Sequence, residues 1–317
     1  LYNDSLVLMY NFDNLSSLGE NDSHIFDASL SKNNGTVKGD LKDSDSGVNC
    51  TTVKYGCNRM FDGFGDYINV GDKSSLELMS SLTIETWIYT IATGGGHVIT
   101  KSARGSGGLD ADPISYDLRI DSSTLNPRFV VSDDGFGIDT LSSRTNLTLN
   151  NWYHLVAIYN GTTLRGYING VLDNSTLTSQ ATGTIANTSE ALFIGSNDDV
   201  DFTFNGLIDT VRIYNRSFTD SEVYQLYASN LYKYNATQWY LVVNQSQNTS
   251  TNLSVGNYTY FTSVKDSAGL ENKTSTRSIQ ITGGAGQVNR APINYTDIFI
   301  NSTNGNNKTA QDLNCYT

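Results

Sequence analysis

Two clusters of acidic side chains are the residues of this sequence best suited to bind a ligand. Ser132-Asp133-Asp134-Gly135 and Asn197-Asp198-Asp199-Val200-Asp201 each follow a run that is typical of a strand. Asp and Asn also favour turns for local reasons, and for the first cluster we favour such a solvated turn. Phe202 and Phe204 follow the second cluster at once, and their rings can stack on a sugar. Ligand binding and a solvated turn are therefore equal alternatives for Asn197, Asp198, Asp199, Asp201 and Phe202.

A single carboxylate within a strand pattern also requires an explanation. In GLIDTVRIYNRSFTDSEVYQLY (206–227), Leu207, Val211 and Ile213 alternate with Ile208, Thr210 and Arg212, which is typical of a strand with one apolar face. Asp209 is in phase with Val211 and Ile213, which predicts that it lies on the apolar face. A buried carboxylate is costly unless another group compensates its charge.

Catalytic constellations are not evident in the sequence. The 3 histidines, His24, His97 and His154, are scattered, and no Cys or His spacing matches a zinc site. No G-x-S-x-G motif occurs, and TGGGH and GSGGLDAD lack the context of a phosphate-binding loop. We expect His154, in WYHLVAIY, to pack at the start of a strand.

The composition excludes several classes of partner. The 317 residues carry a formal net charge of −12 with only 20 Lys and Arg. Nucleic-acid binding needs a concentrated basic surface, and anionic lipids likewise attract basic segments. No apolar run approaches the length of a transmembrane helix. We therefore expect neither a nucleic-acid partner nor direct membrane insertion in this segment.

Asparagine is the most informative residue type. Of the 34 asparagines, 19 lie in N-x-S/T sequons, far more than composition alone would place there. Crowding of Asn, Ser and Thr in turns is one explanation, but we favour N-glycosylation of a secreted or cell-surface protein. The glycosylation candidates are Asn3, Asn14, Asn21, Asn34, Asn49, Asn146, Asn160, Asn174, Asn187, Asn215, Asn235, Asn244, Asn248, Asn252, Asn257, Asn272, Asn294, Asn301 and Asn307.

The cysteines agree with an extracellular location. Cys50 and Cys57 can close a small disulfide loop in an oxidising compartment. Cys315 is then left over, which suggests a partner elsewhere.

Strand patterns dominate the first 229 residues. Short β-branched and aromatic runs alternate with turn residues, as in an all-β sandwich. The expected strands are 7–12, 67–70, 81–90, 97–101, 116–120, 128–131, 152–159, 164–168 and 171–172. Asn169-Gly170 predicts a hairpin. Thr219 and Glu222 form a capping box that predicts a short helix after Phe218.

The rest of the chain divides into two smaller parts. Residues 230–284 predict a short immunoglobulin-like or fibronectin-like β module, with strands near 238–243, 257–265 and 276–281. Residues 285–317 include the end of a linker, GGAGQVNRAP (283–292), and predict the opening strands of a further module or a docking tail.

Residues 1–229 resemble the laminin G-like, concanavalin A-like jelly roll. Seven segments occur in the family's order: LVLMYNFDN (6–14), NNGTV (33–37), MFDGFGDYINV (60–70), SLTIETWIY (81–89), NWYHLVAIYNGTTLRGYINGVL (151–172), ALFIGS (191–196) and the 206–227 stretch. The resemblance implies an all-β fold, an antiparallel sandwich. Residues 230–284 are similar to repeats of surface proteins, by a weaker match.

The resemblance also implies a partner for Asp209. In related sandwiches, including bacterial β-glucanases, an aspartate at this place binds a structural Ca²⁺, and backbone oxygens near the first strand complete the shell. Carried onto this sequence, the metal ligands would be Asp209 and Asp13, with carbonyl groups around Asn34 and Gly35. The alternative is that Asp209 only accepts hydrogen bonds from backbone amides at the start of the strand.

The catalytic motif of the β-glucanase relatives is not matched. Those enzymes carry a Glu-x-Asp-x-x-Glu strand, whereas Glu85 in TIETWIY has no acidic residue at the second or fifth position after it. The resemblance therefore favours a non-enzymatic, calcium-stabilised adhesion or binding module that recognises a glycan or a surface protein. One alternative is a structural subunit of a filament or surface layer that assembles with copies of itself through its C-terminal module and tail. Another is an accessory domain of a carbohydrate-active enzyme.

Overall fold

The computed structural model of this chain forms two compact units, Leu1–Tyr227 and Ala228–Thr317. The predicted boundary lay after residue 229. The structure describes residues 5–39, 47–52, 54–78, 80–102, 113–136, 138–173, 176–177, 183–197, 202–233, 239–243, 256–260, 263–265, 271–273, 275, 277–281, 299–302 and 313–316.

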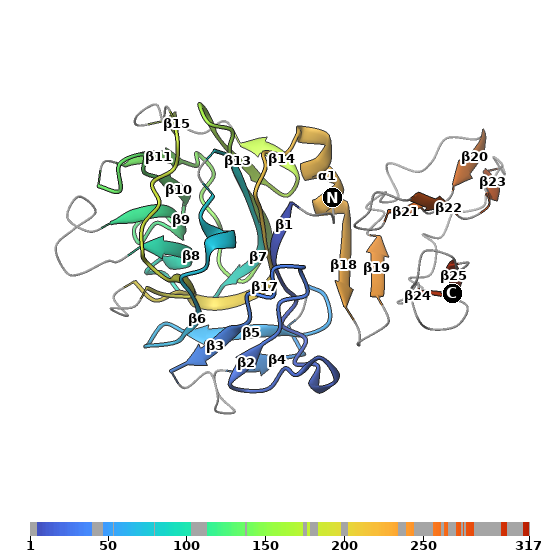
Figure 1. Cartoon of the computed structure of the whole chain (residues 1–317), viewed down its shortest axis with the longest axis horizontal. Coiled ribbons are helices and arrows are strands. Elements are labelled where there is room, and N and C mark those ends of the chain that lie inside the picture. The colour runs from blue at the N-terminus through green and yellow to red at the C-terminus, as the bar shows by residue number, and fades with distance from the viewer. Residues whose placement is uncertain are drawn as a thin grey trace. The chain divides into compact units, whose positions relative to one another are not determined.

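Unit 1 is built from two antiparallel sheets that face each other (Figure 1). Sheet A runs in the order β14 (Val171–Asp173), β13 (Leu164–Ile168), β12 (Trp152–Tyr159), β7 (Leu82–Thr90), β17 (Asn205–Tyr214), β5 (Asn58–Asp62) and β4 (Val48–Asn49), and β1 (Leu6–Tyr10) also pairs with β17. Sheet B runs in the order β15 (Thr176–Leu177), β11 (Asp139–Ser142), β10 (Pro127–Val131), β9 (Ile114–Ile120), β8 (Gly96–Ser102), β16 (Leu192–Ile194), β6 (Tyr67–Gly71), β3 (Gly35–Lys38) and β2 (His24–Ile25). Two short 3₁₀ turns, Ser16–Leu18 and Ser74–Leu76, lie in the connections.

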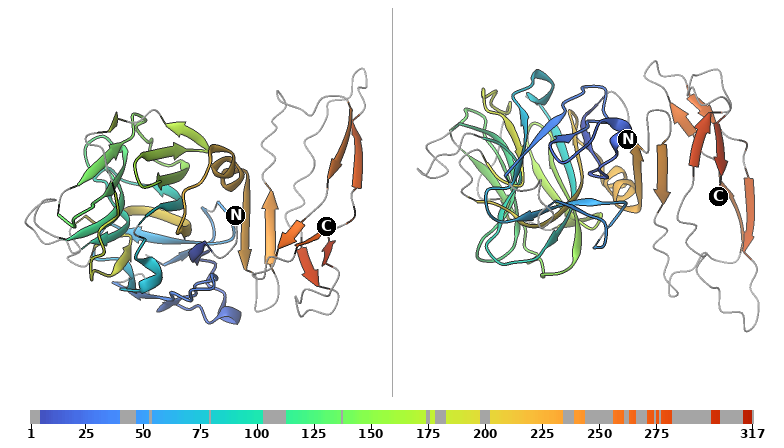
Figure 2. Two further views of the ribbon diagram at one scale, coloured as in Figure 1. Left: turned by 45° about the horizontal axis from the view of Figure 1, so that its top comes forward. Right: turned by 90° about the horizontal axis from the view of Figure 1, so that it is seen from below.

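The core lies between these sheets (Figure 2). Side chains that alternate along each strand meet there, among them Ile84 and Ile88 of β7 and Leu118 of β9. This arrangement confirms the predicted antiparallel β-sandwich, in which inward-facing residues of the two sheets interdigitate.

Sheet A is also buried on its outer face. Trp87 of β7 points away from the core cluster, yet its exposed fraction is 2%. The ring of Tyr227 stacks on it with 5.7 Å between ring centroids, and the ring of Tyr55 meets it edge-on at 5.9 Å. The helix end and the loop after β4 thus form a second layer over the middle of sheet A.

Two local predictions are confirmed. Asn169 and Gly170 both have positive φ, 51° and 77°, as the turn of a type I′ hairpin between β13 and β14 requires. Helix α1 (Asp220–Ala228) begins with the capping box: the Thr219 N–H donates to Glu222 Oε2 at 2.9 Å, and the Glu222 N–H donates to Thr219 Oγ1 at 3.3 Å.

The Glu222 carboxylate makes this helix start sensitive to acid. Its ion pair with Arg216, at 2.7 Å, lowers the pKa of Glu222 from 4.5 to about 2. A lowered folded-state pKa stabilises the protein above about pH 4.5, and the contribution is lost as pH falls through about 2. Because the pair is partly exposed, we expect Glu222→Gln to cost about 1 kcal/mol of unfolding free energy at pH 7.

That difference should shrink to less than half at pH 3. Urea unfolding of the wild type and Glu222→Gln at pH 7 and pH 3 measures it. An equal difference at both pH values would show that the carboxylate charge contributes nothing.

Unit 2 contains short antiparallel strands. One sheet runs in the order β18 (Ser229–Lys233), β19 (Trp239–Val243), β24 (Phe299–Ser302) and β25 (Leu313–Tyr316). Two further pairs join β20 (Gly256–Tyr260) with β23 (Arg277–Ile281), and β21 (Ser263–Lys265) with β22 (Glu271–Lys273). β24 and β25, from the predicted tail, thus share a sheet with β18 and β19. The immunoglobulin-like resemblance stays a prediction. No helix in the described ranges has the length and hydrophobicity needed to cross a bilayer.

Candidate functional site

A bulge in β17 decides which way Asp209 points. The prediction that Asp209 lies on the apolar face with Val211 and Ile213 is wrong. The pairing of β17 with β7 shifts between Asp209 and Val211, and Thr210 has a φ of 53°. A bulge inserts one residue and reverses the alternation after it. Val211 and Ile213 therefore enter the core, whereas Asp209 lies opposite Trp87, on the outer face of sheet A.

Backbone amides of one disulfide loop bind two aspartates, the half-buried Asp13 and the buried Asp209. A disulfide joins Cys50 and Cys57. Within this loop, the Tyr55 N–H donates to Asp209 Oδ2 at 2.9 Å, and the Cys57 N–H donates to Asp13 Oδ1 at 2.9 Å. The loop therefore brings together carboxylates that are almost 200 residues apart in the sequence. The Thr210 hydroxyl adds a hydrogen bond to Asp209 Oδ1 at 3.1 Å.

These hydrogen bonds do not balance the two negative charges. Burial raises the pKa of Asp13 to about 7, against the Cys57 hydrogen bond. Burial, and then the charge of Asp13, raise the pKa of Asp209 well above its ordinary value. Of the nearby cations, Arg212 pairs with Glu85, and Lys54, whose charge interacts with Asp209, has its Nζ 4.0 Å from the centroid of the Trp87 ring. The raised pKa values show that the two carboxylates favour a proton or a bound cation.

The atoms around Asp13 fit a hard cation such as Ca²⁺. Asn14 Oδ1 is buried and has no hydrogen-bond partner among the described residues. Phe12 and Asn14, which flank Asp13, have φ values of 62° and 53°, a costly conformation outside glycine. No group of three or more His, Cys, Asp or Glu side chains in the described ranges could hold a metal ion. A calcium shell of about six to eight oxygens would therefore combine Asp13, Asp209 and Asn14 with backbone oxygens and water.

The other two predicted ligands lie in a different hydrogen-bond network. Asn34 Oδ1 accepts a hydrogen bond from the Asp27 N–H at 2.9 Å, and Asp27 Oδ1 accepts one from the Met9 N–H at 2.8 Å. Gly35 begins β3, where an added Cβ would lie 2.8 Å from the Tyr10 hydroxyl oxygen. The structure thus brings Asp13 close to Asp209, whereas the Asn34 side chain accepts its hydrogen bond from the Asp27 backbone. The metal role of all four residues stays a prediction.

A buried ion-pair network that sequence reasoning missed lies beside this site. Glu85, His154 and Arg212 have exposed fractions of 0%. Arg212 Nη1 donates to Glu85 Oε1 and Oε2 at 3.0 and 3.1 Å, and His154 Nε2 lies 3.2 Å from Glu85 Oε1. Burial opposes ionisation of Glu85, but the Arg212 charge and His154 hold its pKa below its usual value. Burial lowers the pKa of His154. The network neutralises Glu85 and fixes β7, β12 and β17 relative to one another.

The second acidic cluster is only partly described. Asn197 is fully buried, while Asp198, Asp199 and Asp201 lie outside the described residues. Phe202 has an exposed fraction of 42%, whereas Phe204 belongs to the core. Phe202 thus presents an aromatic surface at the end of the sandwich where β8 begins.

The first acidic cluster forms a turn. Asp134 Oδ1 accepts a hydrogen bond from the Phe136 N–H at 2.8 Å, and the Gly135 N–H donates to Ser132 Oγ at 2.8 Å. These contacts agree with the favoured reading of this cluster as a turn.

The described sequons are mostly on the surface. Asn21, Asn34, Asn146, Asn160, Asn187, Asn215 and Asn257 are exposed, and Asn14 and Asn49 are half-buried. The backbones of Asn272 and Asn301 are in strands. Asn3, Asn174, Asn235, Asn244, Asn248, Asn252, Asn294 and Asn307 lie outside the described residues. Glycosylation of all 19 stays a prediction.

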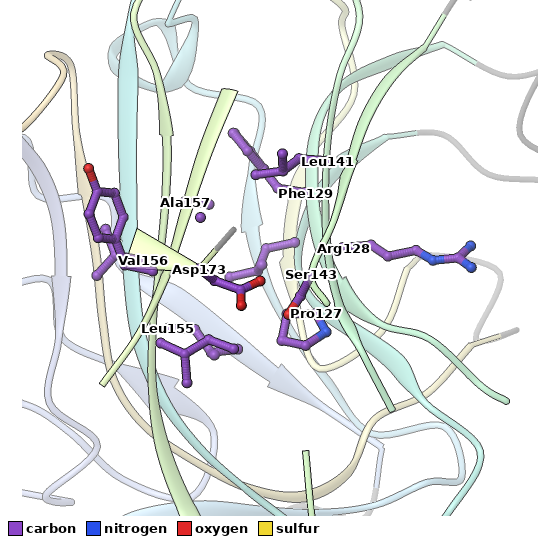
Figure 3. A pocket seen from close by; sticks show the side chains of 13 residues that line it. Pro127, Arg128, Phe129, Leu141, Ser143, Leu155, Val156, Ala157 and Asp173 are labelled. Atoms are coloured by element: carbon purple, nitrogen blue, oxygen red, sulfur yellow. The ribbon is translucent and has the colours of Figure 1, made fainter. Parts of the chain in front are cut away.

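A recess between the sheets is too small for a saccharide. It lies between β10 and β11 of sheet B and β12 and β13 of sheet A, with Phe129, Leu141 and Ala157 in its lining (Figure 3). The Arg128 guanidinium points away from the other labelled side chains. The volume of about 20 Å³ holds about one water molecule.

Comparison with known proteins places unit 1 among lectin-like folds. A family model described as the concanavalin A-like lectin/glucanases superfamily matches residues 61–224, just over half of the chain. A search of curated protein sequences finds no match.

Solved structures show low-identity likenesses. Domain 4 of AbnA, a GH43 extracellular arabinanase from Geobacillus stearothermophilus in complex with arabinotriose, is 20% identical, with 70% of this chain and 98% of that chain covered and a TM-score of 0.49. Trypanosoma rangeli sialidase is 13% identical, with 70% and 32% covered and a TM-score of 0.46, so this chain spans about a third of its length. The receptor binding domain of botulinum neurotoxin C/D mosaic serotype is 15% identical, with 98% and 69% covered and a TM-score of 0.49. Likenesses of this size carry no information on ligand or activity.

Proposed function

Because this chain belongs to the concanavalin A-like lectin/glucanase superfamily, we propose that it is a non-catalytic binding module of a secreted or cell-surface protein. The module recognises a glycan or a partner protein, and Ca²⁺ bound by Asp13 and Asp209 stabilises its sandwich.

The observation that carries the proposal is the exposed aromatic ring of Phe202 at one end of the sandwich. Binding sites combine aromatic surfaces with a few polar groups that fix the orientation of the ligand. Phe202 is 42% exposed, and its backbone oxygen accepts a hydrogen bond from the His97 N–H at 2.8 Å. This hydrogen bond holds the backbone of Phe202 against β8, and the exposed ring can contact a sugar or a partner side chain.

The environment of Glu85 supports binding rather than hydrolysis. A glycosidase needs two carboxyl groups placed across the scissile bond. Glu85 is fully buried and paired with Arg212. It is therefore unsuited to protonate or attack a substrate.

The disulfide and the sequons support an extracellular location. Disulfides persist in oxidising compartments, and N-glycans are added to surface loops of exported proteins. The Cys50–Cys57 bond and the exposed sequon asparagines agree with both conditions.

The alternative role as a structural subunit requires that residues 285–317 add strands to another chain. In this structure β24 pairs with β19 and β25 pairs with β24 within the same chain. Truncation after residue 284 tests assembly: loss of polymers would support it, and unchanged monomers would contradict it.

Retention of the purified full chain on immobilised saccharides and surface proteins tests the proposed function. We expect saturable binding without release of shorter saccharides. Hydrolysis of a bound saccharide, or no binding to any ligand class, would contradict the proposal.

A further inference from the structure

A short hairpin of sheet A carries the loop that contacts Asp13 and Asp209, which we call the cation site. Its first strand, β4, has only two residues and pairs with β5 at the end of the sheet order. Cys50 directly follows β4 and Cys57 directly precedes β5, so the disulfide between them joins the two ends of the loop. Two-residue pairing is a weak anchor for a loop, and the disulfide is the covalent bond that closes it.

Two amides of this loop hold the carboxylates of the cation site. The Tyr55 N–H donates to Asp209 and the Cys57 N–H donates to Asp13, each at 2.9 Å. The two donors are separated by a single residue, so both carboxylates lie against one short piece of backbone. Hydrogen bonds from amides to carboxylates are charge-assisted and orient the acceptor. The position of this backbone therefore sets the positions of both acidic side chains.

Gly56, the residue between the two donors, permits this close approach. Its φ is 52°, in the left-handed region that residues with a side chain rarely adopt. An added Cβ would collide with Asp13 Oδ1. A glycine is thus required here for two independent reasons, the backbone conformation and the contact with Asp13. This observation indicates that the loop is built around the Asp13 carboxylate.

Aromatic contacts fix the middle of the loop over sheet A. The Tyr55 ring meets the Trp87 ring edge-on, with 5.9 Å between centroids, and Lys54 Nζ lies 4.0 Å from the Trp87 centroid. Trp87 lies opposite Asp209 in the strand register. These contacts place Tyr55 at Asp209, whereas the disulfide holds the end of the loop that carries Cys57. We therefore expect the contact with Asp13 to depend most on the disulfide.

The disulfide is accessible to a reductant, because Cys50 is exposed and Cys57 is half-buried. A thiolate of a dithiol attacks one sulfur, which forms a mixed disulfide and releases the other cysteine as a thiolate. The second thiol of the reductant then attacks the mixed disulfide and leaves as a cyclic disulfide. Two electrons and two protons pass from the dithiol to Cys50 and Cys57, which end as thiols.

Opening the loop changes the cation site without removing a ligand. A cation that contacts both carboxylates binds more tightly when they are already held together, because less ordering accompanies binding. Groups that orient metal ligands through hydrogen bonds typically change metal affinity about 10- to 100-fold when they are lost. The two loop amides stand in this relation to Asp13 and Asp209.

We propose that the Cys50–Cys57 disulfide and Gly56 position Asp13 and Asp209 for Ca²⁺, so that reduction of the disulfide weakens calcium binding and reoxidation restores it. Cys50, Cys57 and Gly56 are positioning residues, since they act through the loop backbone. This inference rests on the proposed calcium-stabilised module and names a redox control of its cation site.

Titration calorimetry of the purified full chain with calcium chloride tests the proposal. The oxidised wild type is compared with the wild type reduced by dithiothreitol, with Gly56→Ala, and with the double variant Cys50→Ser and Cys57→Ser, which separates this disulfide from any bond of Cys315. Gly65→Ala is the matched control. Gly65 also has a positive φ, 72°, but an added Cβ there meets nothing within 4 Å. The melting temperature in chelator verifies that each protein is folded and reports any loss of stability that is independent of calcium.

The oxidised wild type and Gly65→Ala should bind Ca²⁺ alike, whereas reduction, the double serine variant and Gly56→Ala should each weaken binding about tenfold or more. Reoxidation should restore the original affinity, and the reduced wild type gives this comparison without any substitution. Unchanged affinity after reduction would overturn the inference and leave the calcium site intact. An oxidised wild type that binds no Ca²⁺ would overturn both the inference and the calcium part of the proposed function.

Discussion

Replacing Arg212 with Met is expected to lower the free energy of unfolding by about 3–5 kcal/mol. Arg212 donates two hydrogen bonds to Glu85, and the exposed fraction of both side chains is 0%. The substitution leaves the Glu85 carboxylate buried, with His154 as its remaining side-chain partner in the network. Leaving one charge buried without its partner costs more free energy than the intact ion pair contributes to stability.

Urea or guanidinium unfolding of the wild type and Arg212→Met measures this loss. Arg165→Met is the matched control, because Arg165 pairs with Asp220 at 3.0 Å in a partly exposed site. It should cost about 1 kcal/mol or less. The double variant Glu85→Gln with Arg212→Met should recover part of the stability, since it removes the buried charge. Equal losses in Arg212→Met and Arg165→Met would contradict a structural role for the network.

Removing Ca²⁺ is expected to lower the melting temperature of unit 1 by about 5–10 °C. A cation present at about 100 times its dissociation constant contributes about 2.7 kcal/mol, and each kcal/mol shifts the melting temperature of a domain of this size by about 2–4 °C. The physical reason is the pair of carboxylates of Asp13 and Asp209, which have raised pKa values and whose ionised forms a divalent cation stabilises.

Asp209→Asn separates calcium binding from general electrostatics. The amide keeps the shape of the side chain and removes its charge, so the difference between calcium and chelator should disappear. Asp133→Asn changes the net charge equally at an exposed turn and should keep the full calcium response. Calorimetry measures the melting temperatures of the wild type, Asp209→Asn and Asp133→Asn with excess Ca²⁺, with excess Mg²⁺ and with a chelator. An undiminished calcium shift in Asp209→Asn would disprove the assignment of this residue.

Local patterns were sufficient to predict much of the fold. The expected strand at 152–159 is β12, and the Asn169-Gly170 turn and the Thr219 capping box form as predicted. In each case a few adjacent residues carry the information. The strand is indicated by alternating residues, the turn by an Asn-Gly pair that tolerates positive φ, and the helix start by a side chain that accepts a hydrogen bond from a nearby amide. The family segments extend this information to the order of the strands.

The direction of Asp209 was not predictable from alternation. A bulge at Thr210 reverses the faces of β17, and a β-branched residue gives no sequence signal for positive φ. Two steps along β17, from Asp209 to Val211, correspond to one step along β7, from Trp87 to Thr86. Only the assembled sheet fixes this register.

The buried network of Glu85, His154 and Arg212 was missed for a related reason. Glu85, His154 and Arg212 come from three strands that are far apart in the sequence, and strand order alone brings them together. The contact between His97 and Phe202 likewise joins residues that are more than 100 positions apart in the sequence. A charged residue on an outward strand position normally predicts solvent exposure, but α1 and the disulfide loop cover this face of sheet A.

Saturation-transfer NMR on the natively purified full chain, mixed with neutral oligosaccharides, is the most direct test of a binding module without catalytic activity. One sample reports both which sugar protons contact the protein and whether shorter saccharides accumulate. We expect saturation of protons on one face of a sugar ring, loss of that signal in Phe202→Ala, and unchanged oligosaccharide after prolonged incubation. New reducing ends that appear with the wild type and fail to appear with Glu85→Gln would contradict it.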